Sequence, residues 1–244
     1  MANQPDNHGA RPGELQELAE ELSQRARGRR HPVMRMRLWN FTVAGSYAVK
    51  RLFDIAGALA GVILLSPLLA LLALAVRLTS KGPAIYIQTR VGRFGRHFKF
   101  YKFRTMYIDA DRRKQALLSS NESRDGVIFK MRHDPRVTPL GRLLRRSSLD
   151  ELPQLLNVLL GDMSLVGPRP PLPSEVARYS LEDRKRLNAI PGLTCLWQVG
   201  GRSDIPFSQQ VQLDKAYIHS RSFRGDLAIL LRTIPAILTG RGAY

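Results

Sequence analysis

The most pronounced pattern in the chain is an uncharged apolar segment, IAGALAGVILLSPLLALLALAV, which runs from Ile55 to Val76. A straight helix of these 22 residues would be ~33 Å long, which matches the hydrocarbon thickness of a bilayer. Ser66 and Pro67 lie at its centre, where proline removes a backbone hydrogen bond and the serine hydroxyl can donate to the freed carbonyl. The pattern predicts two apolar helical arms with a break between them, each about as long as one leaflet is deep.

Both flanks of this segment are strongly basic. Residues 25–51 contain eight lysines and arginines, and residues 77–104 contain another eight and no acidic residue. Positively charged flanks stay on the cytoplasmic side of a membrane. The equal flanks therefore favour a re-entrant hairpin that returns to the face it entered. A single kinked span and a buried helix of a soluble domain are the two alternatives.

Two shorter segments after the apolar one alternate between apolar and polar residues. Residues 84–88 and 97–103 predict strands, and the glycines at 92 and 95 predict the turn that joins them. Aromatic residues interleaved with lysines suit either single-stranded nucleic acid or the headgroup level of a membrane, and the neighbouring apolar segment favours the membrane. We expect the second strand and the arginine after it to separate these residues onto two faces: Phe98, Phe100 and Phe103 against Lys99, Lys102 and Arg104.

The rest of the chain is predicted to be mainly helical. Leucines recur at helical spacing in LPQLLNVLL, residues 174–190 predict a helix with one charged side, and residues 207–239 are largely helical. The last of these is too short and too interrupted for a second membrane span. The predicted fold class is α+β, mainly helical and membrane-associated, with a re-entrant helix-break-helix hairpin and a small β element.

The charge balance narrows the class of partner. Of 244 residues, 38 are Lys or Arg and 20 are Asp or Glu, which gives a net charge of +18. This excess predicts a polyanionic partner, which is nucleic acid, an anionic membrane face or a phosphorylated small molecule. The sequence has no helix-turn-helix or metal-finger spacing that would support nucleic acid. The single cysteine, Cys195, excludes an internal disulfide and predicts a small core residue.

Adjacent carboxylates stand among arginines in RRSSLDELPQLLNVLLGDMSLVGPRP, which begins at residue 145. A structural interpretation makes Ser148 and Glu151 a capping box, or makes Asp150 itself the cap of the helix that contains Pro153. Either way the two carboxylates would lie at a helix N-terminus, where backbone amides favour negative charge. This interpretation does not explain why so many arginines surround them.

A chemical interpretation does explain the arginines. Helix-terminal amides and Arg145 would lower the pKa of Asp150 and keep it ionised. An ionised aspartate can attack a phosphoryl group and form an aspartyl-phosphate. Glu151 can hold Mg²⁺ together with substrate phosphates. Arg169, in a rigid Gly-Pro-Arg-Pro turn, would help Arg145 to neutralise a diphosphate; the alternative for this segment is a plain turn.

Five motifs occur in one order along the chain: KRLFDIAGAL with its later SP, YKFRTM, SLDELPQL-NVL-GDMSLVGPRP, PGLTCLWQVGGRS and GRGAY. Through them the chain from Val49 to Tyr244 resembles the bacterial sugar transferase family, the monotopic phosphoglycosyl transferases that start exopolysaccharide and O-antigen assembly. The resemblance implies transfer of a hexose 1-phosphate from a UDP-sugar to undecaprenyl phosphate, with release of UMP and a covalent aspartyl-phosphosugar intermediate.

The resemblance also implies roles for individual residues. Asp150 would be the nucleophile, Glu151 its Mg²⁺-associated partner, and the Ser66-Pro67 pair the break in the membrane helix. The basic substrate-binding positions would be Arg145, Arg169, Lys102 and Arg104, and the GGRS loop adds Arg202, which could meet the phosphates or base of the donor or could belong to a plain turn. The family usually has glycine where Cys195 stands, which predicts tighter packing and unchanged chemistry.

The implied organisation has three parts. Residues 1–48 form a basic, partly disordered extension, residues 49–82 the re-entrant membrane helix, and residues 83–244 a catalytic domain on the cytoplasmic face of the bacterial inner membrane. The implied partners are the UDP-sugar, undecaprenyl phosphate and anionic lipids, without nucleic acid; a homodimer stays open. The GRGAY ending favours glucose or galactose. The alternatives are an N-acetylated UDP-sugar, or a non-enzymatic membrane adaptor of polysaccharide assembly.

Overall fold

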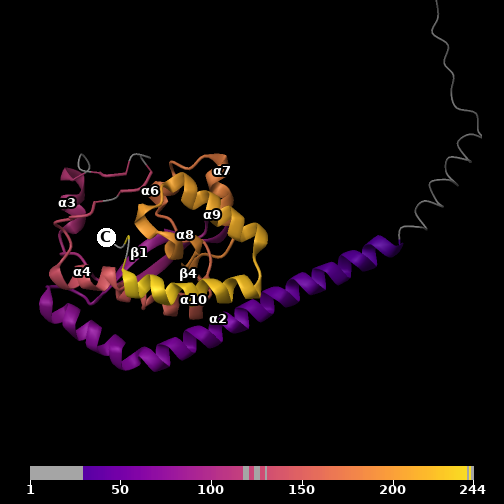
Figure 1. The fold of residues 1–244 in the computed structure, drawn as a ribbon, viewed down its shortest axis with the longest axis horizontal. Helices are drawn as coiled ribbons and strands as arrows, with labels where there is room; N and C mark the ends of the chain where they lie inside the picture. The colour runs from indigo at the N-terminus through magenta and orange to yellow at the C-terminus, as the bar shows by residue number, and fades with distance from the viewer. Residues whose placement is uncertain (1–29, 118–120, 124–126, 130, 241, 243–244) are drawn as a thin grey trace, which may run out of the picture. The chain divides into compact units, whose positions relative to one another are not determined.

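The computed structural model describes residues 30–117, 121–123, 127–129, 131–240 and 242 (Figure 1). The chain divides into two compact units, Met1–Lys50 and Arg51–Tyr244. The disorder expected in the N-terminal extension falls before residue 30 and lies outside the described residues. In the first unit, the described residues form the beginning of helix α2 (Arg30–Thr79).

Helix α2 carries the apolar segment and bends in its later part (Figure 1). Pro67 lies inside the helix and lacks the N–H that would reach the Ile63 carbonyl. Ser66 Oγ donates to that same carbonyl at 2.8 Å, as the sequence predicted. The kink predicted in this segment is present as a bend, and helical conformation continues through Pro67 so that the two arms form one helix.

The apolar part of α2 is largely exposed. The stretch Tyr47–Thr79 has a mean hydropathy of 2.6 and is, by length and composition, able to cross a membrane, yet only 11% of its most apolar window is buried. Large side chains such as Leu52, Leu64 and Leu78 are 67%, 77% and 76% exposed. A helix in the core of a soluble protein would bury such residues, so the exposed leucines need an apolar environment.

Beyond residue 50, α2 belongs to the second unit and packs against the rest of it on both sides of the bend. Before the bend, Ala58 joins a core cluster with Leu155 and Leu165, and Asp54 accepts a hydrogen bond from the Leu165 N–H at 3.1 Å. Beyond the bend, the buried Leu72 and Val76 are members of a second cluster that is closed by Phe103 and Leu144. The bent helix is thus fixed to the body of the unit on both sides of Pro67.

Strands β1 (Ile85–Val91) and β2 (His97–Phe103) form an antiparallel hairpin around the turn η1 (Arg93–Gly95), as predicted. Their register is regular, so side chains alternate strictly between the two faces. The predicted sorting of side chains in β2 is therefore wrong. Lys102 shares a face with Phe98 and Phe100, while Phe103 points to the opposite face and into a different core cluster.

The phenylalanines of β2 are not at a membrane surface. Phe98, Phe100 and Phe103 are 8%, 1% and 2% exposed and form the two core clusters. The interpretation of this strand as a headgroup-level aromatic surface is wrong, because the rings supply the apolar core that a small sheet needs on both faces.

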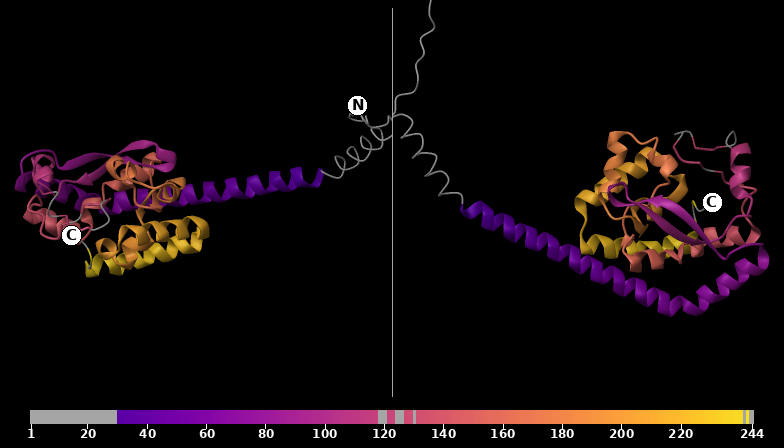
Figure 2. Two further views of the ribbon diagram at one scale, coloured as in Figure 1. Left: turned by 90° about the horizontal axis from the view of Figure 1, so that it is seen from above. Right: turned by 180° about the vertical axis from the view of Figure 1, so that it is seen from behind.

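The remaining elements follow in chain order and are mostly short. A second, parallel two-stranded sheet joins β3 to β4. The elements are α3 (Ala110–Ala116), α4 (Pro139–Arg146), η3 (Leu149–Glu151), α5 (Gln154–Leu160), β3 (Ser164–Val166), α6 (Pro173–Val176), α7 (Leu181–Arg184), η4 (Lys185–Asn188), β4 (Gly192–Thr194), α8 (Leu196–Gly200), η5 (Arg202–Asp204), α9 (Phe207–Ser220) and α10 (Phe223–Thr239). The β1–β2 hairpin and α10 lie on opposite sides of the unit (Figure 2).

The helical prediction is confirmed at the C-terminal end and wrong before it. Residues 207–239 form α9 and α10, with a turn between them. Residues 174–190 form three short pieces in place of one helix. Ser180 interrupts them, because its backbone is extended and its hydroxyl accepts from the Asp183 N–H at 3.2 Å, which starts a new helix.

Candidate active site

A cavity of about 370 Å³ opens around the adjacent carboxylates. Its polar wall combines residues from the β2 strand, the α4–α5 segment, the turn after β3 and the loop after α8. Six of the seven polar residues that the sequence singled out line it: Lys102, Arg145, Asp150, Glu151, Arg169 and Arg202.

The carboxylates lie on a short 3₁₀ turn, η3, before helix α5. Ser148 has φ 55° and forms no side-chain cap, and α5 begins only after Pro153. Both predicted caps are therefore wrong: no capping box joins Ser148 to Glu151, and Asp150 does not cap a helix. The turn is closed by its backbone, since the Glu151 N–H donates to the Ser148 carbonyl at 3.2 Å.

Asp150 is buried but unpaired. Its exposed fraction is 7%, and within the described part of the chain no residue donates a hydrogen bond to its carboxylate. Burial, and then the charge of Glu151, raise its pKa to about 6, although Lys102 and two arginines oppose the shift. The expected lowering of this pKa is wrong, because desolvation outweighs the nearby positive charge.

Glu151 has a different environment from its neighbour. Arg169 Nη2 lies 2.7 Å from its Oε1 atom. Burial raises the pKa of Glu151, but the Arg169 ion pair and hydrogen bond, with help from Lys102 and Arg90, outweigh burial and leave the pKa below its usual value. Near neutral pH, Glu151 is therefore the more strongly ionised of the two carboxyls, and any shared proton resides on Asp150.

Arg169 is positioned by a close crossing of two backbones. The Gly167 N–H donates to the Thr194 carbonyl at 3.0 Å, and the Gly192 N–H donates to the Pro168 carbonyl at 2.9 Å. A Cβ atom on Gly192 would lie 2.0 Å from the Gly167 nitrogen, so this crossing requires glycine. The prolines after it limit the backbone, and the guanidinium is directed toward Glu151.

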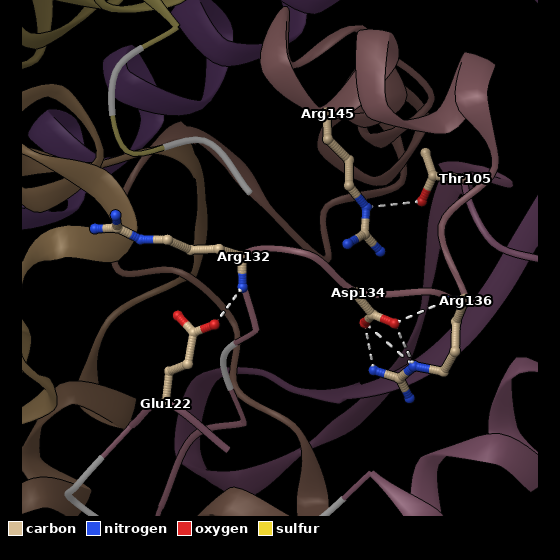
Figure 3. A network of polar contacts seen from close by, with 6 residues as sticks. All are labelled: Thr105, Glu122, Arg132, Asp134, Arg136 and Arg145. Carbon is tan, nitrogen blue, oxygen red and sulfur yellow. Dashed lines mark hydrogen bonds and ion pairs between the residues drawn. The ribbon is translucent and has the colours of Figure 1, made fainter. Parts of the chain in front are cut away.

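Arg145 and Lys102 form the next part of the polar wall. Arg145 Nε donates to Thr105 Oγ1 at 3.0 Å (Figure 3). Helix α4 can approach Thr105 only because residue 141 is glycine, where a Cβ atom would lie 2.1 Å from the Thr105 carbonyl oxygen. Burial, together with the charge of Arg145, lowers the pKa of Lys102 to about 8. Both cations therefore face the cavity under desolvation.

The structure brings Arg202 to the cavity and keeps Arg104 out of it. Arg202 lies on η5 with φ 53°, and its Nη1 is 3.5 Å from the Arg146 carbonyl. Arg104 is 6% exposed, and its guanidinium donates to the carbonyls of Pro83 and Ser80 at the end of α2. Its Nη1 and Nη2 atoms are engaged there, away from Asp150, while its Nε has no hydrogen-bond partner among the described residues. Arg104 lines a separate cavity beside β1.

The opposite wall of the cavity is apolar and was not anticipated from the sequence. Helix α10 contributes Leu230, Thr233, Ala236 and Ile237, and the β4–α8 segment adds Leu193 and Val199. The other face of α10 is an exposed apolar stripe at helical spacing: Phe223, Leu227, Leu231, Ile234 and Leu238. The spacing of that stripe is readable in the sequence, but which side faces the site depends on tertiary packing.

Asn157 is a further residue that the motif analysis missed. It is fully buried in α5, its Oδ1 accepts from the Tyr101 N–H at 3.1 Å, and its Nδ2 donates to the Lys99 carbonyl at 2.6 Å. This side chain fixes β2, and with it Lys102, to the segment that carries the carboxylates. The signal in the sequence is a pair of amides, Gln154 and Asn157, in the otherwise apolar run LPQLLNVLL.

The Asp150–Glu151 carboxylate pair fits a metal ion that binds together with the phosphates of the substrate. In the described part of the chain, no group of three His, Cys, Asp or Glu side chains is placed to hold an ion. Mg²⁺ commonly binds one or two carboxylates plus substrate phosphates and waters, without a complete protein cage. Asp150 and Glu151 supply two adjacent carboxylates for such a site, and one Glu151 oxygen is paired with Arg169.

Comparison with known proteins gives a consistent set of relatives. The bacterial sugar transferase family matches residues 45–240. The undecaprenyl-phosphate galactose phosphotransferase of Salmonella typhimurium is 42% identical over 218 residues, which cover 88% of this chain and 46% of that protein. The exopolysaccharide production protein ExoY of Sinorhizobium fredii is 42% identical over 198 residues, 80% of this chain and 88% of ExoY.

A relative named for glucose matches as well. The UDP-glucose:undecaprenyl-phosphate glucose-1-phosphate transferase of Caulobacter vibrioides is 44% identical over 203 residues, which cover 80% of this chain and 72% of that protein. The chain thus spans less than half the length of the Salmonella protein and most of the length of ExoY.

Proposed function

The chain belongs to the bacterial sugar transferase family, and from that premise we propose that it transfers a hexose 1-phosphate from a UDP-sugar to undecaprenyl phosphate and releases UMP. Glucose and galactose are the favoured hexoses, because relatives are named for each. One observation carries the proposal. Asp150 is a buried carboxylate without a hydrogen-bond partner among the described residues, and it shares a cavity with four cations: Lys102, Arg145, Arg169 and Arg202.

In the first step, an Asp150 oxygen attacks the β-phosphorus of the donor. The bond between that phosphorus and the bridging oxygen breaks, UMP leaves with the bonding electron pair, and an aspartyl-phosphosugar remains. A carboxylate attacks well only when it is ionised and not already bound, and Asp150 satisfies the second condition. The surrounding cations offset the negative charge that gathers as the phosphoryl group transfers.

In the second step, a phosphate oxygen of undecaprenyl phosphate attacks the same phosphorus. The acyl-phosphate bond breaks, the Asp150 carboxylate is restored, and the product is undecaprenyl diphosphate hexose. The carboxylate now leaves, and Lys102, Arg145 and Arg169 stabilise its returning charge. One nucleophile thus serves both half-reactions, which predicts ping-pong kinetics.

Glu151 would act in the first step as a metal ligand, and its ion pair with Arg169 holds it in place. When bound, Mg²⁺ would neutralise diphosphate charge beside Asp150 and Glu151. Arg169 keeps Glu151 ionised and fixes its orientation, so that the carboxylate remains available as a metal ligand.

The acceptor lipid would approach from the apolar side. The exposed leucines of α2 and the stripe on α10 form apolar surfaces, and the inner side of α10 lines the catalytic cavity. We assign residues 49–82 to a re-entrant element in the cytoplasmic leaflet, and residues 83–244 to the cytoplasmic face. The bend at Ser66-Pro67 supports this, because it lets both basic flanks stay on one side.

The direct test is release of UMP from UDP-glucose or UDP-galactose, in the presence of undecaprenyl phosphate and Mg²⁺. The parent protein should release UMP with one of these donors, and Asp150→Asn should not. Release that is undiminished in the variant would remove Asp150 as the nucleophile. Absence of release with both donors, followed by activity with an N-acetylated donor, would change the sugar and keep the reaction.

A further inference from the structure

A second cavity of about 600 Å³ lies on the β1–β2 side of the catalytic residues. Lys102 and Arg145 line both cavities, so these two cations form a wall that the cavities share. The volume lies in the range of small-molecule sites in proteins, roughly 300–1,000 Å³. The larger of the two spaces is thus the one without the nucleophile.

One face of the hairpin provides a side of this second cavity. Tyr86, Gln88 and Arg90 alternate along β1, so they point to the same face, and Lys102 lies directly opposite Tyr86 in the register. Arg90 Nε and Nη2 donate to Gln88 Oε1 at 3.1 and 2.8 Å, and Arg90 Nη1 donates to the Pro170 carbonyl at 3.0 Å. This row of side chains is therefore held in place by its own hydrogen bonds.

The chemistry of the lining suits a planar base with a phosphate. Three aromatic residues, Tyr86, Tyr107 and Phe129, line the space together with the Gln88 amide and arginines. Asp111 and Glu175 also line it, but Glu175 is engaged, since its Oε2 accepts from the Leu172 N–H at 2.9 Å. Aromatic faces stack on bases, and amides pair with their carbonyl and N–H groups.

We propose that the second cavity binds the nucleoside monophosphate half of the donor. The diphosphate then extends past Lys102 and Arg145, so that its sugar-bearing phosphate lies beside Asp150. This assignment rests on the proposed function. It leaves the apolar α10 side of the catalytic cavity to the acceptor lipid, so that UMP departs on the β1–β2 side. The two substrates of a ping-pong reaction would then reach one phosphorus from different sides.

Binding of UMP, measured by calorimetry on the full-length protein in detergent or nanodiscs, tests this assignment without turnover. Gln88→Ala removes the amide and should weaken UMP binding about tenfold, the value of one to two hydrogen bonds. Gln88→Glu keeps an acceptor for Arg90 but adds negative charge, and should weaken binding further. Thr89→Ala is the matched control, because Thr89 is the adjacent exposed residue on the opposite face of β1.

The kinetic readout should separate donor from acceptor. In Gln88→Ala, KM for the UDP-sugar should rise with UMP product inhibition weakened in parallel, while KM for undecaprenyl phosphate stays unchanged. A photoreactive 5-azido-UDP-glucose should label residues 86–90 or 127–129. Wild-type UMP binding in both Gln88 variants, or labelling confined to residues 193–202, would overturn the assignment.

The two proposals can fail separately. Donor-dependent UMP release by the parent protein, combined with unaffected Gln88 variants, would refute the nucleoside site and retain the transferase. A parent protein that neither binds UMP nor releases it would refute both.

Discussion

Two buried aspartates of this protein lie among arginines and have opposite electrostatic states. Asp134 forms a close pair with Arg136, in which Arg136 Nη2 lies 2.6 Å from its Oδ2 atom (Figure 3). Asp150 is equally buried, and no residue in the described part of the chain donates a hydrogen bond to it. Burial raises the pKa of both, but the Arg136 hydrogen bonds bring that of Asp134 below its usual value, while that of Asp150 rises to about 6.

The difference shows how the same residue types give a structural pair or a reactive group. Asp134 uses its oxygens on one neighbour two residues away, so its charge is compensated permanently. Asp150 has positive charge nearby but no direct partner, because the adjacent Glu151 takes Arg169 and Thr105 takes Arg145 Nε. A buried charge without a partner destabilises a fold, and such sites are retained where function requires them.

The largest expected effect is on catalysis. Asp150→Asn should lower UMP release by about 10⁴-fold or more, because the nucleophile is lost and the two steps cannot proceed. The same substitution should leave the fold intact, since it removes an uncompensated buried charge. Release rates are measured with UDP-glucose and UDP-galactose, and the melting temperature is measured on the same samples. A variant with a retained rate would mean that Asp150 and Asp134 do not differ in the way described.

The same substitution at Asp134 should lower the stability of the fold. Asp134→Asn leaves the Arg136 charge buried without its partner and should cost about 3–5 kcal/mol in the free energy of unfolding. The rate per folded molecule should change by no more than a few fold. Asp109→Asn is the control, because the Asp109–Arg113 pair is exposed and should contribute at most about 1 kcal/mol. Equal melting temperatures for the two variants would contradict the structural role of Asp134.

A smaller effect on catalysis is expected from the ion pair between Arg169 and Glu151, which gives Glu151 an environment different from that of Asp150. Arg169→Lys keeps the positive charge but loses the planar guanidinium, and should lower kcat/KM by about 10²-fold. The variant should also shift the pH dependence of the rate, because a weaker partner for Glu151 changes the proton affinity of its neighbour. Arg232→Lys, at an exposed position on α10, is the control. An unshifted pH profile would limit Arg169 to substrate binding.

The smallest effect is a difference in the pH dependence of stability. The pKa of Asp150 is raised in the folded state, so the folded protein binds the proton more tightly than the unfolded chain, and stability falls as pH rises from about 4 through about 6. Asp150→Asn should remove this loss, a gain of the order of 2 kcal/mol above pH 6. Asp134 has a lowered pKa, so its contribution is present at neutral pH and is lost only in acid.

Denaturant unfolding at pH 4.5 and pH 7.5 measures this difference. Asp150→Asn should become more stable than the parent only at the higher pH, whereas Asp134→Asn should be less stable at both. The catalytic rate of the parent should also rise with pH through about 6, because the attacking carboxylate must be ionised. The same pH dependence of stability in the parent and in Asp150→Asn would contradict the raised pKa.

The sequence predicted the composition of the site better than its electrostatics. Asp150, Glu151, Arg145 and Arg169 lie in contiguous motifs, and such local patterns can be recognised without a fold. The raised pKa of Asp150 depends on how deeply the body of the protein buries it, and local pattern carries no information on that burial. Arg104 was assigned to substrate binding with Lys102 because both lie in the YKFRTM motif, but its side chain turns to the end of α2.

The same reasoning applies to the fold. Ser66 and Pro67 act through neighbouring backbone atoms, so their bend and hydrogen bond could be predicted. The apolar wall that α10 contributes could not be predicted, because it depends on where a helix distant in the sequence packs. The two faces of β2 were misassigned because the prediction assumed a break in the alternation of side chains. The register of β2 is regular and contains no such break.

The most direct test of the proposed mechanism is whether Asp150 carries the phosphosugar. The parent protein is incubated with the UDP-sugar and Mg²⁺ without undecaprenyl phosphate, and intact-mass and peptide spectra are recorded after rapid quenching. If Asp150 is the nucleophile, the peptide that contains it gains the mass of one hexose phosphate, one UMP is released per label, and the label is lost when the acceptor is added. Acceptor-dependent turnover without any labelled protein, or a label on another residue, would contradict it.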